Sequence, residues 1–135
     1  MDTKSRAARA LQVGAVLFTL SSLSCNLTSF TGVYTPVITN DTDNYEFQVT
    51  LKGITNREED RWQNTGNAAN VTLSSAVSGG TATVSIMDAD GTVLYTHALD
   101  GSGLGGTGAG TSGLWTIVVV MTNTTGTLDF KVQKP

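Results

Sequence analysis

Cysteine and histidine are almost absent from the sequence, with one residue of each in 135, and only 14% of the residues are charged. One cysteine excludes a disulfide within the chain, and one Cys with one His leaves too few ligands for a zinc site of those side chains. The eight Lys and Arg are outnumbered by eleven Asp and Glu, so no basic surface is expected to neutralise nucleic-acid phosphates. We therefore expect no nucleic-acid partner, no cofactor and no enzymatic activity.

The abundant residues are those that favour strands. The chain contains 22 Thr, 13 Val and 4 Ile, whose branching at Cβ restricts the side chain and suits a pleated surface better than a helix. This composition predicts an all-β domain.

The first 24 residues have the order of a secretory signal peptide. Basic residues at Lys4, Arg6 and Arg9 precede an apolar run from Ala10 to Leu20, and small residues follow it. The run is 11 residues long, whereas a permanent membrane span needs about 20. We therefore predict a signal peptide over residues 1–24, with an apolar signal helix, and an exported protein.

The single cysteine, Cys25, follows the apolar run at the place where a bacterial lipoprotein carries its lipid-modified cysteine. The preceding residues resemble that motif in part, since Ser24 fits it and Ser22 and Leu23 do not. A lipid thioether would also remove a free thiol from an oxidising compartment. We predict a lipid anchor on Cys25, a tether over residues 25–32, and a protein held at the membrane of the cell envelope, in the outer membrane or periplasm. The alternative is ordinary cleavage after Ser24, which gives a secreted protein.

Alternation of apolar and polar residues marks the strands of the remaining chain. From Tyr45 to Lys52, the apolar side chains all fall on one face, which is the pattern of a half-buried strand. Asp88 to Gly91 predicts the turn of a hairpin. Seven or eight short antiparallel strands over residues 33–135 predict a β-sandwich of the jelly-roll or immunoglobulin-like kind. The predicted strands are 33–39, 45–52, 70–74, 81–87, 92–99, 114–122 and 127–132.

Three segments invite a chemical interpretation that their context does not support. Residues 101–113 contain seven glycines with dinucleotide-type spacing, but a strand follows them instead of a helix, so a flexible connection is expected. Asp88 and Asp90 lack the further ligands of a calcium loop. The charged run Arg57 to Arg61 is expected to be a solvated loop, and a hydrolase built on its three adjacent carboxylates is a weaker hypothesis.

The aromatic residues are the candidates for a binding surface. Trp62 lies in polar company, where an exposed indole would stack on a sugar ring or a partner protein, with Tyr45 or Tyr34 beside it. The alternative is that Trp62 covers one end of the core, because large aromatic side chains dominate small cores. The sequence therefore leaves a carbohydrate-binding module as the second hypothesis of function.

The end of the chain carries a resemblance. Gly113-Leu-Trp-Thr-Ile-Val-Val and Gly126-Thr-Leu-Asp-Phe-Lys-Val132 resemble the last strands of bacterial pre-peptidase C-terminal and P-domain-like β-sandwiches, and the similarity extends over residues 81–132. Together with Cys25, the whole chain is similar to small bacterial lipoproteins of uncharacterised function. The resemblance implies a β-sandwich fold and does not specify an activity. The first hypothesis of function is therefore an exported, lipid-anchored, non-enzymatic module whose partner is another protein or a polymer of the envelope, such as a glycan.

Overall fold

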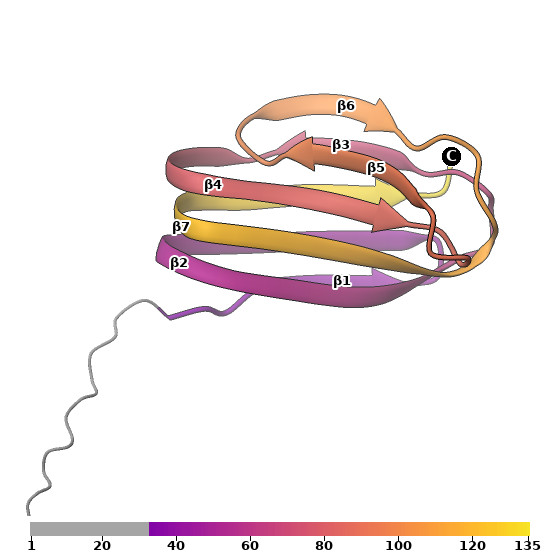
Figure 1. Cartoon of the computed structure of the whole chain (residues 1–135), viewed down its shortest axis with the longest axis horizontal. Coiled ribbons are helices and arrows are strands. Elements are labelled where there is room, and N and C mark those ends of the chain that lie inside the picture. Colours follow the sequence, from indigo (N-terminus) through magenta and orange to yellow (C-terminus); the bar gives the residue numbers. More distant parts are fainter. Residues whose placement is uncertain (1–32) are drawn as a thin grey trace, which may run out of the picture. The chain divides into compact units, whose positions relative to one another are not determined.

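Strands make up most of the part of the chain that the structure, a computed structural model, describes, which is residues 33–135. These residues contain no helix, and hence none long and apolar enough to cross a membrane. Two of the seven strands have 21 residues each. The strands (Figure 1) are β1 (Val37–Asp41), β2 (Asn44–Asn64), β3 (Asn70–Ser74), β4 (Ala76–Met87), β5 (Val93–Ala98), β6 (Ser102–Gly106) and β7 (Gly113–Gln133).

All pairings are antiparallel, and the two long strands take part in both halves of the fold. Residues 44–51 of β2 pair with residues 126–133 of β7, and residues 54–64 of β2 pair with residues 113–124 of β7. Between these two stretches the register shifts and the strands bend, so the sheet folds over on itself without closing into a barrel. Figure 1 shows the strands turning at one end of the molecule from the nearer layer to the more distant one.

The fold therefore has two layers that share their long strands. In the first layer, the order is β1, the first half of β2, the second half of β7, β3 and β6. In the second layer, the order is the second half of β2, the first half of β7, β4 and β5. β7 has neighbours on both sides in each layer, which makes it the central strand of the molecule.

The bend is built from residues with unusual backbone conformations. Asn123 and Gly126 in β7 have φ angles of 47° and 137°, and Gly80 in β4 has a φ angle of 68°. Such values are accessible to glycine and tolerated by asparagine. The buried hydroxyl of Thr124 donates a hydrogen bond to the carbonyl oxygen of Thr81, which joins the bends of β7 and β4.

The core lies between the two layers and uses alternate residues of each strand. Phe47 of β2 stacks on Phe130 of β7, with ring centroids 5.4 Å apart. Trp62 and Trp115 meet edge to face at 5.9 Å. The other fully buried large side chains are those of Tyr45, Ile86, Leu99, Ile117, Met121, Leu128, Val71 and Val84.

The structure confirms the prediction of an all-β antiparallel fold with sandwich-like layers, and it confirms the hairpin at Asp88 to Gly91. It corrects three details. Residues 57–61 belong to β2 instead of a loop, residues 102–106 of the glycine-rich segment form β6, and the two strands predicted within 114–132 are one bent strand, β7. The predicted signal helix lies outside the described residues.

Candidate functional site

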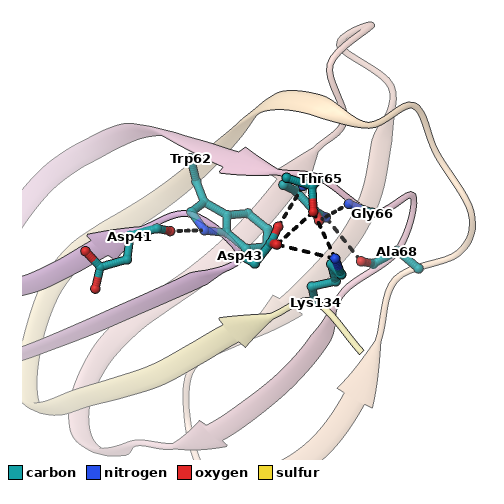
Figure 2. A network of polar contacts seen from close by, with 8 residues as sticks. Asp41, Asp43, Trp62, Thr65, Gly66, Ala68 and Lys134 are labelled. Carbon is teal, nitrogen blue, oxygen red and sulfur yellow. Dashed lines mark hydrogen bonds and ion pairs between the residues drawn. The ribbon is translucent and has the colours of Figure 1, made fainter.

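The structure places Trp62, the first candidate for ligand stacking, inside the core. Its relative exposure is 0%, and Trp115 covers it edge to face. Its Nε1 donates a hydrogen bond of 3.0 Å to the carbonyl oxygen of Asp41 at the end of β1 (Figure 2). Both the ring and its Nε1 are therefore engaged in contacts within the domain. This agrees with the alternative prediction that Trp62 belongs to the core.

Tyr45 is also fully buried, and it links the two layers. Its ring packs near Phe130 in the first layer, with centroids 6.0 Å apart. Its hydroxyl donates a hydrogen bond of 2.6 Å to the carboxylate of Asp60, which lies on the half of β2 that belongs to the second layer. Burial, and then the Asp60 carboxylate that accepts this hydrogen bond, raise the pKa of Tyr45 far above its ordinary value.

Tyr34 precedes β1 and is half-buried against the core. Burial, and next the negative charge of Glu58, raise the pKa of its hydroxyl to about 12. No Phe, Tyr or Trp side chain among residues 33–135 is exposed, since even Tyr95 is half-buried. The expectation that Trp62 and Tyr45 present rings to a glycan is therefore corrected, because the small core buries both rings, whereas Tyr34 is only half-buried and its predicted role stays a prediction.

Replacing Tyr45 by phenylalanine tests the bond between the layers. We expect the free energy of unfolding to fall by about 2 kcal/mol, because the variant loses a hydrogen bond to a charged, half-buried carboxylate. The effect has a definite pH dependence. A tyrosine with a raised pKa in the folded state contributes stability below about pH 10 and loses that contribution as the pH rises further.

Urea unfolding of the wild type and of Tyr45→Phe between about pH 8 and pH 11.5 measures both effects. The wild type should lose more stability than the variant over this interval. The remaining loss in the variant reports Tyr34 and Tyr95, whose pKa values burial also raises. Equal slopes for the two proteins would show that Tyr45 ionises without disturbing the fold.

The three adjacent carboxylates of β2 do not converge. Glu59 faces outward and forms an ion pair of 2.8 Å with Arg57, whereas Glu58 and Asp60 lie on the opposite side of the strand, towards Tyr34 and Tyr45. This alternation separates Glu59 from the other two carboxylates. Glu58 and Asp60 share one side of the strand, where Asp60 accepts the hydrogen bond of the Tyr45 hydroxyl. Within residues 33–135, no three or more His, Cys, Asp and Glu side chains are grouped in a way that would hold a metal ion.

A polar network that the sequence did not predict closes one end of the sandwich (Figure 2). The Asp43 carboxylate accepts hydrogen bonds of 2.7 Å from both the backbone N–H and the hydroxyl of Thr65, and Lys134 lies 3.4 Å from it. These hydrogen bonds, with the Lys134 charge, hold the pKa of Asp43 below its ordinary value. The buried Asn64 side chain donates to the carbonyl of Ala68 and accepts from the N–H of Gly66.

Asp88 plays a similar structural role at the hairpin between β4 and β5. Its carboxylate accepts hydrogen bonds from the backbone N–H groups of Asp90, Thr92 and Thr111, at 2.9 to 3.0 Å. These hydrogen bonds lower the pKa of Asp88, and the one from the Thr111 N–H has the largest effect. Both carboxylate oxygens of Asp88 are thus engaged with backbone donors of the turn and of the glycine-rich segment, and the Asp90 carboxylate accepts a hydrogen bond from the Thr111 hydroxyl.

The described residues also form an open hollow of about 410 Å³ on the outer face of the first layer. Its polar lining comes from Thr35, Gln48, Thr50, Thr127 and Asp129. The Asp129 carboxylate already accepts a hydrogen bond of 3.2 Å from Gln48. None of the three candidate aromatic residues lines this hollow, so the structure does not bring the predicted binding residues together at one open site.

Cys25, the predicted site of lipidation, lies outside the described residues. The fold was foreseeable from the alternation of residues, but the end network was not, because Asp43, Thr65 and Lys134 are far apart in the sequence and carry no motif. No protein-family model matches the sequence, and a search of curated proteins finds no significantly similar one. The resemblance to pre-peptidase C-terminal and P-domain-like modules therefore stays a prediction.

Proposed function

We propose that the chain is an exported protein anchored to a membrane by lipid on Cys25, and that its domain is a non-enzymatic module for contacts in the cell envelope. The observation that carries the proposal is the place of Cys25. It follows the apolar run that ends at Leu20 and precedes by eight residues the start of the described part of the chain at Val33.

The short tether limits where the module can act. Seven residues, 26–32, separate Cys25 from Val33, and an extended chain of that length spans at most about 25 Å. A domain held in this way stays next to the membrane surface. After residue 24, five Lys and Arg and ten Asp and Glu give a formal net charge of −5, so the lipid and not the charge of the domain would supply the attraction to an anionic bilayer.

The domain supports a role in binding through its surfaces instead of a chemical reaction. Its two tryptophan rings are buried in the core, and two of its three adjacent carboxylates are engaged within the domain, Glu59 by Arg57 and Asp60 by the Tyr45 hydroxyl. What it offers to a partner is strand edges and polar outer faces. The first layer, for example, carries the ion pair of Glu46 with Lys131 and the hydrogen bond of Gln48 with Asp129 on its outer face.

Metabolic labelling with a radioactive or clickable fatty acid in a bacterial host tests the anchor. We expect label in the wild type and in the matched control Ser24→Ala, which keeps a small residue before the cysteine, and none in Cys25→Ala. A wild-type protein that is cleaved and exported without label would overturn the lipid anchor and favour the secreted alternative. An unprocessed chain that remains in the cytoplasm would overturn the proposal of export.

A further inference from the structure

The described residues leave four strand edges without a neighbouring strand: β1 and β6 in the first layer, and the second half of β2 and β5 in the second. An unpaired edge presents backbone N–H and C=O groups to any extended chain, and most proteins protect such edges. Side chains bridge two of these edges here. Asn40 donates to the carbonyl of Arg61, and Trp62 donates to the carbonyl of Asp41.

The edge of β5 is protected by an irregularity in its pairing and by a side chain. Its pairing with β4 is interrupted by a register shift next to Met87, which distorts the strand. The N–H of Leu99 donates a hydrogen bond to the carbonyl oxygen of Ala82 in β4. Because successive residues of an antiparallel strand direct their backbone groups to opposite sides, the carbonyl of Ala98 points towards the free edge. That carbonyl lies 2.7 Å from Nδ1 of His97, so a side chain already occupies it.

The edge of β6 has no such protection among the described residues. The strand reads Ser-Gly-Leu-Gly-Gly, with no charged residue, no proline and no register shift in its pairing with β3. Its central residue, Leu104, is 87% exposed, the highest value of any large apolar side chain in residues 33–135. Figure 1 shows β6 as the outermost strand of its layer, at the top of the view.

The backbone groups that face outward follow from the register. Ser75 N–H donates to the carbonyl of Gly101, and Thr107 N–H donates to the carbonyl of Ala69, so the odd-numbered residues of this segment bond to β3. In an antiparallel pair the intervening residues point the other way. Ser102, Leu104 and Gly106 therefore direct three N–H and three C=O groups away from the sheet.

We propose that this edge pairs with the same edge of a second copy of the chain, antiparallel and centred on Leu104. A two-fold axis there places Leu104 opposite Leu104 of the second copy, and Ser102 opposite Gly106. All three pairs are of the hydrogen-bonded type, which gives six hydrogen bonds between the copies. The two Leu104 side chains then lie side by side on the outer face of a continuous first layer and shield each other from water.

A second copy fits this edge better than a charged peptide does. β6 has no charge with which to select a charged strand, and self-pairing places no like charges opposite each other within the strand. The pairing involves only five residues of each copy, so its area is small compared with the ~1,200 Å² of a stable complex, and the dimer should be weak. Because each copy carries a net charge of −5 after residue 24, salt should strengthen the association by screening.

Disulfide trapping tests the register in the full chain, with Cys25→Ala in every protein so that the added cysteine is the only one. The proteins are kept in mild detergent and oxidised. We expect Leu104→Cys to form a covalent dimer and Ser102→Cys alone to form little, because Ser102 is opposite Gly106 of the other copy. A mixture of Ser102→Cys and Gly106→Cys should recover the dimer. Equal yields for Leu104→Cys and Ser102→Cys, or no dimer with either, would overturn the proposal.

Sedimentation equilibrium of the Cys25→Ala chain provides the second measurement. We expect Leu104→Lys to weaken self-association at least tenfold, because it places two positive charges opposite each other. Val37→Lys is the matched control, since Val37 is 66% exposed on the other edge strand of the same layer. Equal losses in both variants would assign the effect to net charge instead of to β6, and that result would also contradict the proposal. Neither measurement depends on the lipid anchor.

Discussion

Replacing Trp62 by alanine should lower the free energy of unfolding by about 3 to 5 kcal/mol, the range of large aromatic side chains removed from a core. Trp62 has no exposed surface, packs edge to face with Trp115 and donates a hydrogen bond to the carbonyl of Asp41. The variant would therefore lose apolar burial, leave a cavity and remove the bridge between β2 and β1. Urea unfolding followed by circular dichroism measures the loss.

Two controls separate burial from other effects of the substitution. Trp62→Phe keeps part of the packing and should cost less than alanine, whereas Leu104→Ala removes an 87% exposed side chain and should change stability by less than about 0.5 kcal/mol in the monomer. If Trp62 served mainly to stack on a glycan, Trp62→Ala would leave stability near the wild-type value. That outcome would contradict the buried position of the ring.

Replacing Gly80 by alanine should cost about 3 to 5 kcal/mol, and it tests the bend. Gly80 has a φ angle of 68°, which L residues avoid, and an added Cβ would overlap the backbone carbonyls of Thr122 and Asn123 in β7. These are backbone atoms, so no side-chain rotation relieves the overlap. The bends of β4 and β7 would have to move apart, and the buried Thr124 hydroxyl would lose its bond to Thr81.

The matched control is Gly91→Ala, at the hairpin between β4 and β5. Gly91 also has a left-handed φ angle, 86°, but an added Cβ would meet nothing within 4 Å. This variant should therefore cost only about 1 kcal/mol, the conformational contribution alone. A cost at Gly80 equal to that at Gly91 would show that the two bends separate easily and do not define the fold.

The sequence predicts which side chains of a strand face the core, because each layer has one buried face and one face in contact with water. Tyr45, Phe47, Val49 and Leu51 share a face by alternation, and the structure buries all four. The charged run from Arg57 to Arg61 misled the prediction, because β2 becomes an edge strand there. On an edge, charged side chains remain in contact with water on both faces of the strand, so charge and strand are compatible.

The end of the chain shows a more general limit. Asn123 and Gly126, between the two strands predicted at 114–122 and 127–132, both have positive φ angles. A local signal of this kind cannot distinguish a turn that reverses the chain from a bulge that redirects it into another layer. Only the partners of β7, which come from β2 and β4 far away in the sequence, decide between the two outcomes.

The candidate binding residues were harder to place than the strands. Polar neighbours made Trp62 look exposed, yet two of them, Asp60 and Asn64, serve as hydrogen-bonding partners at the rim of the core. The glycine-rich segment was expected to be a flexible connection, whereas the free edge of β3 turns part of it into β6. In both cases the deciding contact joins residues with no local pattern that links them.

The position of β7 also has a consequence for how the chain folds. It pairs with β2, β3 and β4 and lies in the middle of both layers, yet it comes after all of them in the sequence. The pairs between β2 and β7 join residues that are 49 to 89 positions apart in the sequence. Long loops must therefore close before most of the strand pairs of the sheet can form. As the chain is synthesised, the earlier strands wait without their central partner. We therefore expect the domain to assemble only once β7 has emerged, and an open chain before that point would suit the export proposed above.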